Sequence, residues 1–233
     1  MQKSKRQNLI YEYVKKHKDV QIADIAVAVE ASPSTIRRDV KELAQKGLVV
    51  ELYGSVVLES QNEVDIETNQ RAKMHLEEKQ AIGKIAAQHI TKNQFIYVDA
   101  GTTTIEMIPY IHCEHCVFVT NGLDIALALT RRGYEVQILG GFIKPVTEAI
   151  VGEFALEYLA QLHFDLAFIG ANGVSELGFS TPDHKEGLLK KRVIQNARQS
   201  YILADTSKEN KTTSFIFGKK EEAIWIHEKG EVL

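Results

Sequence analysis

Three segments near the N-terminus repeat apolar side chains every three or four positions, which is the spacing of amphipathic helices. The segments are residues 5–17, 22–30 and 31–47. Their apolar positions are Leu9, Ile10, Tyr13 and Val14, then Ile22, Ile25, Ala26 and Val29, then Ile36, Val40, Leu43 and Ala44 as the buried stripe of the third. In the third segment Ser32 is a favourable N-cap, Pro33 suits the first helical position, and Gly47 is expected to end the helix.

The polar face of the third predicted helix is rich in hydroxyl and basic side chains. It presents Ser34, Thr35, Arg37, Arg38 and Lys41. Three helices with a tight turn before the third match a helix-turn-helix, whose last helix enters the major groove of DNA. The next run, LVVELYGSVVL at residues 48–58, predicts a two-stranded wing around Gly54. The alternative is that the three cations form an ordinary solvated helix face.

Beyond residue 58 the pattern changes from helices alone to helices alternating with apolar runs. Residues 59–74 are polar and acidic at first and suit a linker, so we expect a DNA-binding domain at 1–58 and a second domain at 75–233. A long helical pattern covers residues 72–90. The expected strands are residues 95–99, 116–120, 135–139, 165–170, 200–205 and 223–227. This alternation predicts an α/β domain with a largely parallel sheet.

Small and hydroxyl residues gather where these strands end. In an open α/β sheet, ligands bind beyond the carboxyl ends of the strands. The candidates from the residues alone are Asp99, Gly101, Thr102, Thr103, Thr104, Thr120, Asn121, Gly140, Gly141, the run Gly170 to Gly173, Asp205 and Lys208. A helix start after Gly101 favours a phosphate through its free N–H groups, and Lys208 adds a positive charge. The residues at any one strand end are typical of an ordinary capped turn. Five strand ends with the same kind of residues together predict one shared ligand site.

Composition and charge narrow the class of protein. Hydrophobic residues make up 44% and charged residues 25% of the chain, as in globular proteins. The net charge of −3 argues against a strongly basic nucleic-acid binder. Residues 1–58 nevertheless hold ten basic and seven acidic side chains, a balance of +3 against −6 for the other 175 residues. No apolar stretch approaches the roughly 20 residues that span a bilayer, and the N-terminus is too charged for a signal peptide, so we expect a cytoplasmic protein without a membrane partner.

The two cysteines, Cys113 and Cys116, raise the possibility of a metal or redox site beside His112 and His115. A structural zinc site needs four ligands, and neighbouring positions of an extended segment point in opposite directions. The chain has no second cysteine pair. We therefore favour a loop that leads into a buried strand and expect no metal and no cofactor.

The segment STIRRDVKELAQKGLVV resembles the recognition helix and wing entry of DeoR-type transcriptional repressors, where a Thr-x-Arg-Arg-Asp motif is typical. The resemblance implies that Thr35, Arg37 and Arg38 face DNA and that Asp39 is a structural polar partner. The wing departs from the family pattern. Members usually carry a basic residue and His-Gly-Gly-Ala there, whereas this chain places Glu51 in ELYGSVVL. Because Glu51 repels phosphates, we expect DNA affinity to depend mainly on the helix.

The resemblance extends over almost the whole chain. The strand-end series resembles the DeoR-type sensor domain, which is similar in fold to ribose-5-phosphate isomerase, glucosamine-6-phosphate deaminase and CoA-transferase subunits. Family effectors are typically phosphorylated sugars or their derivatives. The carry-over places the strand-end residues named above at the effector, except the run Gly170 to Gly173. It adds Glu186 and Lys190 from STPDHKEGLLKKRVI. Where the family usually reads Glu-Ala, this chain has Gly187 after Glu186.

Three classes of function are compatible with these patterns. The preferred one is a ligand-controlled repressor of a sugar-utilisation operon that binds operator DNA as a homodimer or homotetramer. A sugar-phosphate isomerase or deaminase fused to a DNA-binding module is the alternative, because Asp99, Asp183, Glu186 and Lys208 offer acid and base groups. The chain lacks the isomerases' Asp-Gly-Ala-Asp and Lys-Gly-Gly-Gly segments, so we expect no catalysis. An architectural DNA-binding protein predicts no ligand response, which the strand-end residues argue against.

Overall fold

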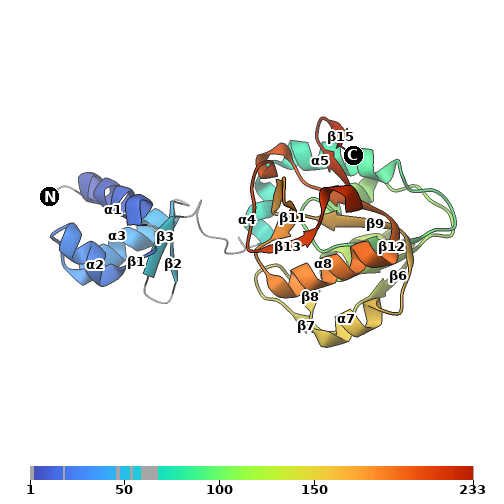
Figure 1. The fold of residues 1–233 in the computed structure, drawn as a ribbon, viewed down its shortest axis with the longest axis horizontal. Helices are drawn as coiled ribbons and strands as arrows, with labels where there is room; N and C mark the ends of the chain where they lie inside the picture. Colours follow the sequence, from blue (N-terminus) through green and yellow to red (C-terminus); the bar gives the residue numbers. More distant parts are fainter. Residues whose placement is uncertain (1–2, 18, 46–47, 53–54, 59–67, 233) are drawn as a thin grey trace. The chain divides into compact units, whose positions relative to one another are not determined.

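The computed structural model describes residues 3–17, 19–45, 48–52, 55–58 and 68–232 (Figure 1). The chain divides into two compact units, Met1–Val64 and Asp65–Leu233. Each unit has its own apolar core, so each is described separately.

The first unit is a three-helix domain with a small sheet. Its elements are α1 (Lys3–His17), β1 (Asp19–Gln21), α2 (Ile22–Ala28), α3 (Pro33–Gln45), β2 (Val49–Leu52) and β3 (Ser55–Leu58). The strands pair in the order β1-β3-β2, and both pairs are antiparallel. Ile10, Ile25, Ile36 and Val40 are fully buried where the three helices meet. The three predicted helices and the predicted wing hairpin are confirmed.

Several details of this unit differ from the sequence pattern. Ala44 is exposed, so its place in the buried stripe was wrong. Successive helical residues are rotated by about 100°, and Ile36, Val40 and Leu43 already fill the face of α3 that meets its neighbours. Strand β1 was not predicted, because three residues are too few to show a period. The expected roles of Gly47 and Gly54 fall outside the residues that the structure describes.

The second unit is built on a seven-stranded sheet with the order β15-β14-β12-β9-β4-β5-β6. These strands are β4 (Phe95–Val98), β5 (Val117–Thr120), β6 (Glu135–Ile138), β9 (Phe164–Gly170), β12 (Ala197–Leu203), β14 (Ile224–His227) and β15 (Gly230–Val232). All pairs are parallel except β14 with β15. All six strands predicted from the apolar runs are present, and the expected parallel sheet is confirmed.

Helices cover both faces of this sheet, as Figure 1 shows for α8 in front of β9 and β12. The helices are α4 (Thr68–Lys73), α5 (Leu76–Ala87), α6 (Leu123–Arg131), α7 (Glu153–Leu159) and α8 (His184–Asn196), with 3₁₀ turns η2 (Ile105–Tyr110), η3 (Thr206–Lys208) and η4 (Lys220–Glu222). Neighbouring residues of one strand enter opposite cores. Ile96 and Val98 pack with α5, η2 and α6, whereas Tyr97 packs on the side of α7 and α8. Burial on both faces explains why the strands read as continuous apolar runs.

Two smaller sheets complete the unit. Strands β10 (Gly173–Ser175), β11 (Gly178–Thr181) and β13 (Phe215–Gly218) form an antiparallel sheet, and β7 (Phe142–Ile143) pairs with β8 (Ile150–Val151). None of these short strands was predicted from the sequence. Within the described ranges, no helix is both long and apolar enough to cross a membrane.

Two helix predictions for this unit were wrong. The pattern over residues 72–90 forms two helices, because His75 adopts a left-handed conformation (φ 53°) between α4 and α5. The helix expected after Gly101 is the six-residue 3₁₀ turn η2. Pro109 lies within η2 and has no N–H to donate, so a longer α-helix is disfavoured there.

Candidate functional site

The first candidate surface is the polar face of α3. Ser32 caps this helix, because its Oγ accepts the N–H of Thr35 at 3.3 Å, and Pro33 is the first helical residue, as predicted. The side chains of Ser34, Arg37, Arg38 and Lys41 are exposed, and Thr35 is half-buried. The predicted DNA-binding residues therefore share one accessible helix face.

The acidic residues of α3 form ion pairs with α1. Asp39 is buried, and its carboxylate accepts hydrogen bonds from Nε and, at 3.2 Å, from the second guanidinium nitrogen of Arg6. This contact raises the pKa of Arg6 and confirms Asp39 as a structural partner. Glu42 pairs with Lys3 at 2.7 Å. Because α1 supplies a cation to each of these carboxylates, the charges of α3 without an ion-pair partner among the described residues include those of Arg37, Arg38 and Lys41.

The predicted wing contact cannot be placed in the same detail. The backbone of Glu51 belongs to β2, but its side chain lies outside the described part of the chain. Its expected repulsion of phosphates therefore stays a prediction.

The second candidate site begins at the turn after β4. The hydroxyl of Thr104 is fully buried and donates within the turn, to the carbonyls of Asp99 (2.7 Å) and Gly101 (2.9 Å). It therefore shapes the turn. Within the described residues the backbone N–H groups of Thr102, Thr103 and Thr104 donate no hydrogen bond. Neighbouring free N–H groups of this kind form a concave site for an anion.

The end of β5 holds this turn from the side. The side-chain carbonyl of Asn121 accepts the N–H of Ala100 at 2.8 Å, and its amide donates to the carbonyl of Ile150 at 3.4 Å. Thr120 Oγ accepts the N–H of Gly122 at 3.0 Å. Both predicted residues are thus buried and support the backbone of the site.

Asp99 and Lys190 form a buried ion pair beneath the turn. Lys190 Nζ donates to the Asp99 carboxylate and, at 3.0 Å, to the carbonyl of Gly170. The same carboxylate accepts the N–H of Gly170 at 3.1 Å. Burial raises the pKa of Asp99, and the charge of Lys190 offsets only part of this rise. The ends of β4 and β9 and the helix α8 therefore converge on one carboxylate.

Glu186 lies near Asp99, whose pKa its negative charge also raises. Its carboxylate accepts the hydroxyl of Thr147 at 2.6 Å and the ammonium of Lys144 at 3.1 Å. Lys144 also pairs with Asp183, the N-cap residue of α8, at 3.0 Å. Lys144 and Thr147 were not predicted. They belong to the segment between β7 and β8, which gave no periodic signal.

The glycine pair after β6 is linked to the site only through its neighbours. Gly140 has open space where a Cβ would stand, and Gly141 has a φ of +153° with its Cβ position 2.5 Å from the carbonyl oxygen of Val151. Gly141 thus permits the close approach of β7 to β8. Among the described residues, the hydrogen bonds and ion pairs at the other predicted positions involve neither glycine.

A group of cations surrounds Asp205 at the end of β12. Asp205 is buried and caps η3 by accepting the N–H of Ser207 at 3.0 Å. Burial lowers the pKa of Lys208, and the positive charges of Lys211 and Arg71 lower it further, while Asp205 acts in the opposite direction. The pKa of Lys79 is lowered by its own burial and by the charges of Lys208 and Arg71. Arg71 and Lys79 were not predicted.

Lys79 connects these cations to the threonine turn. Its pKa responds to the charge of Glu106 in η2, the element that follows the turn. Gly83 lies one helical turn after Lys79 on the same side of α5, and a Cβ there would stand 2.5 Å from the backbone of Glu106. The cations therefore flank the threonine turn on the side of α5.

The cysteine segment shows no metal-binding arrangement. Cys113 is half-buried, and Cys116 is buried with its thiol directed at the carbonyl of Thr91 (3.1 Å). Burial raises the pKa of Cys113 to about 12, together with a hydrogen bond to Cys116. In the ranges that the structure describes, no three His, Cys, Asp or Glu side chains are placed to hold a metal ion.

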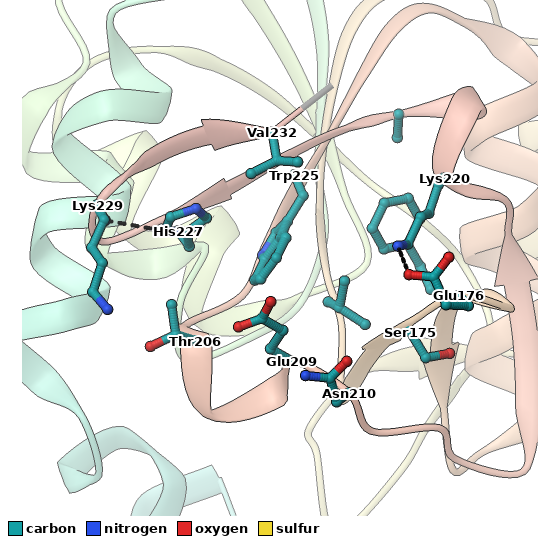
Figure 2. A pocket seen from close by; sticks show the side chains of 13 residues that line it. Ser175, Glu176, Thr206, Glu209, Asn210, Lys220, Trp225, His227, Lys229 and Val232 are labelled. Atoms are coloured by element: carbon teal, nitrogen blue, oxygen red, sulfur yellow. Dashed lines mark hydrogen bonds and ion pairs between the residues drawn. The ribbon is translucent and has the colours of Figure 1, made fainter.

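A cavity of about 350 Å³ opens beside η3, between the β10–β11 hairpin and β14. Figure 2 shows Trp225, His227 and Lys229 on one side of it and Glu176 with Lys220 on the other. Its lining contains none of the predicted effector residues. Trp225 Nε1 already donates to the carbonyl of Ala204 at 2.8 Å, and Lys220 pairs with Glu176. This cavity therefore borders the strand ends but differs in chemistry from the threonine turn.

Comparison with known proteins places both units in one family. Residues 6–62 match the DeoR-like helix-turn-helix domain, and residues 74–227 match the DeoR C terminal sensor domain. The HTH-type regulator FruR of Bacillus subtilis, itself uncharacterized, is 36% identical over 98% of this chain and 92% of its own. The glycerol-3-phosphate regulon repressor of Escherichia coli is 29% identical over 89% of this chain and 83% of its own.

Among solved structures, ribose-5-phosphate isomerase A of Neisseria gonorrhoeae is 17% identical, covers 56% of this chain and 52% of its own, and gives a TM-score of 0.42. The two domain matches confirm the predicted resemblance and the predicted order of a helix-turn-helix unit followed by an α/β unit. The chain therefore belongs to the DeoR family of helix-turn-helix transcriptional regulators.

Proposed function

We propose that this regulator represses a sugar-utilisation operon and that a phosphorylated sugar bound at the strand ends controls its affinity for the operator. The name of the Escherichia coli relative supports the direction of regulation, because that protein is a repressor of a phosphometabolite regulon. The observation that carries the proposal is that one chain joins an exposed basic recognition helix to a polar site with free anion-binding groups.

On the DNA side, Ser34, Thr35, Arg37, Arg38 and Lys41 are the proposed contacts. Arg37 and Arg38 form no ion pair with another described residue, so their guanidinium groups are available to bases and phosphates. The hydroxyls of Ser34 and Thr35 lie near the N-terminal end of α3, within 3.0 Å of Ser32 Oγ. Helix N-termini and hydroxyls are common phosphate contacts.

On the effector side, the two ends of the site differ in charge. We infer that Lys208 with its neighbouring cations forms one end, and that Asp99, Asn121 and Glu186 form the other. A phosphorylated sugar has the same polarity, because a dianionic group is attached to a row of hydroxyls. We infer that the phosphate binds at the threonine turn and Lys208, with the sugar hydroxyls toward Asp99 and Glu186.

The alternative is an isomerase-like or deaminase-like activity in the same site. Asp99 is the candidate base, since burial raises its pKa. However, Asp99 already accepts a hydrogen bond from Lys190, and Glu186 accepts hydrogen bonds from Lys144 and Thr147. Both carboxylates are thus engaged in fixing neighbouring segments, so we infer binding without turnover.

We further propose that the chain acts as a homodimer or homotetramer. Two recognition helices are needed to contact two half-sites of an operator. The second unit exposes large apolar side chains on neighbouring elements, namely Ile138 at the end of β6, Phe142 and Ile143 in β7, and Phe154 and Tyr158 in α7. We call this the β7–α7 face. Apolar side chains grouped at a surface are typical of contacts between subunits.

The function is tested in two steps with the full chain. Selection from random DNA duplexes yields the bound sequence, and binding of that duplex is then measured with and without phosphorylated sugars that raise the melting temperature of the protein. We expect at least one such sugar to change operator affinity by about 1–3 kcal/mol, the usual size of an allosteric coupling. Analysis of the same sugars after incubation reveals turnover. The proposal is contradicted if the protein converts one of these sugars. It is also contradicted if none of the sugars that stabilise the protein changes its affinity for DNA.

A further inference from the structure

Arg71 on α4 has a hydrogen-bonding group that is unpaired among the residues the structure describes. Its Nε is buried and makes no hydrogen bond within the described residues. An unpaired buried donor of this kind is costly, because it loses its hydrogen bonds to water without gaining others. Such a donor is completed either by a water molecule or by a ligand atom, and the charges around Arg71 decide between them.

Two lysines lie near Arg71, and Asp205 is the carboxylate whose charge acts on both of them. Lys79 is only 5% exposed, and its Nζ donates to the backbone carbonyl of Arg71. Lys208 is near enough for the charge of Arg71 to lower its pKa. In the described part of the chain, neither lysine pairs with a carboxylate within 4.0 Å. The charges of Asp205 and Glu106 offset part of the repulsion among the three cations, but the pKa values of both lysines are still lowered. A bound anion relieves the repulsion that is left.

We propose that Arg71, together with Lys79 and Lys208, binds the anionic group of the effector and that Arg71 thereby fixes α4 against the sensor unit. The proposal rests on the effector site proposed above and adds Arg71 and Lys79 to the residues that hold its phosphate group. Arg71 contributes a planar fork of donors that fits two phosphate oxygens, and the lysines contribute point charges. The threonine turn supplies backbone N–H groups to the remaining oxygen.

Because of the position of α4 in the chain, the contact between Arg71 and the anion has a consequence for regulation. Helix α4 is the first helix of the second unit and follows the segment that joins it to the DNA-binding unit. Without an anion, α4 is attached here through the bond between the Arg71 carbonyl and Lys79. With an anion, the side chain of Arg71 adds a second attachment. Occupancy of the site thus changes how firmly α4 is held against the sensor unit.

The binding step is tested by calorimetric titration of the full chain with inorganic phosphate. We expect Arg71→Gln to weaken phosphate binding by roughly ten- to hundredfold, the range for losing a hydrogen bond to a charged group. Arg71→Lys keeps the charge and should recover part of the affinity. The matched control is Lys73→Gln, which removes a positive charge from an exposed position of the same helix and should bind as the unaltered chain does.

The relay step is tested by hydrogen exchange of residues 68–73 in the same proteins. Phosphate should slow exchange in this segment of the unaltered chain and of Lys73→Gln, but not of Arg71→Gln. Equal slowing in Arg71→Gln overturns the role of Arg71 in fixing α4.

The outcomes separate this inference from the proposed function. If Lys208→Gln abolishes phosphate binding and Arg71→Gln binds normally, the effector site stands and the role of Arg71 is wrong. If the unaltered chain binds no phosphate, the anion site itself is wrong. Operator binding by α3 is measured independently and is unaffected by either result.

Discussion

Gly187 lies in the first turn of α8, directly after Glu186, and Phe215 fills the space beside it. A Cβ built on Gly187 would stand 2.2 Å from Cδ1 of Phe215. Packing therefore requires glycine at this position, because α8 and β13 approach more closely here than an alanine side chain allows. This explains the departure from the Glu-Ala pattern of the family. The helix start itself is regular, since Asp183 caps it through the N–H of Glu186 at 2.9 Å.

Gly187→Ala should destabilise the second unit by about 1–3 kcal/mol, the usual cost of overpacking a well-filled site. Urea denaturation of the full chain measures this change. Adding Phe215→Leu should restore part of the loss by making room for the methyl group. Gly140→Ala is the matched control, because open space surrounds that position. Equal losses at both glycines would show that the Phe215 contact is not the cause.

Arg38→Ala should weaken operator binding by roughly ten- to hundredfold if the side chain contacts a base, since such contacts contribute about 1–3 kcal/mol. Binding is measured by fluorescence anisotropy at several salt concentrations. A purely electrostatic contact would instead reduce the slope of affinity against salt by about one. Arg131→Ala removes an exposed positive charge from the other unit and should leave affinity unchanged. Unaltered operator affinity in Arg38→Ala excludes this residue from the interface.

At the residue scale, the sequence predicted the site residues that follow strands but missed those that helices contribute. Asp99, Asn121 and Asp205 follow strands, so the topology of a parallel sheet places them at one edge. Arg71 and Lys79 belong to helices α4 and α5, so the rule about strand ends does not predict them. One signal was available for Lys79, because it shares a face of α5 with buried Ile82, Gly83 and Ala86. A lysine in an otherwise apolar helix stripe indicates a buried charge with a specific role.

At the scale of elements, prediction succeeded where a pattern is long and local. The six strands of the main sheet are buried on both faces, and their apolar runs are unmistakable. Strands β7, β8 and β10 have two or three residues each, and their pairing depends on distant segments. The break at His75 was also missed, because a left-handed residue other than glycine leaves no mark in apolar periodicity.

The segment before β5 provides a prediction with a definite pH dependence. Burial raises the pKa of Cys113 to about 12, so its thiolate is scarce at pH 8, whereas an ordinary cysteine with a pKa of about 8.5 is partly ionised there. Iodoacetamide should therefore modify Cys113 at least about a hundredfold more slowly than free cysteine. The rate should rise about tenfold per pH unit between pH 8 and 10. Mass spectrometry of the peptide measures it.

The same pKa shift affects stability in a known direction. Because the folded thiol ionises at higher pH than the unfolded one, the stability it contributes is present below about pH 8.5 and is lost as the pH rises toward about 12. A plateau in the modification rate near pH 9 would contradict the raised pKa. It would also reopen the reactive or metal-binding interpretation of the Cys-x-x-Cys segment.

At the scale of the whole molecule, the two units have separate cores. A ligand bound in the second unit can influence the first through the connecting chain, and it can also act through the arrangement of subunits. The proposed role of Arg71 concerns the first route. The β7–α7 face concerns the second, because repositioned subunits change the spacing of two recognition helices.

Phe142 and Phe154 are 72% and 70% exposed, so polar replacements there should not disturb the core of the subunit. Phe142 lies against Gly152, which precedes α7, so the two aromatic rings belong to neighbouring elements. We expect the double variant Phe142→Ser with Phe154→Ser to lower the association state in sedimentation velocity while its melting curve stays close to that of the unaltered chain. Operator affinity should fall with it, because one recognition helix cannot contact two half-sites.

The control for this prediction is Leu177→Ser, which removes an apolar side chain of 64% exposure from the β10–β11 hairpin. It should leave association and operator binding unchanged. If the double variant still associates fully, the β7–α7 face is not the subunit interface. If it becomes monomeric yet binds the whole operator as before, operator recognition does not depend on paired subunits. Binding to a single half-site is the second control. If the monomeric variant binds it as tightly as the unaltered chain does, α3 is intact, and the loss of operator affinity comes from the loss of subunit pairing.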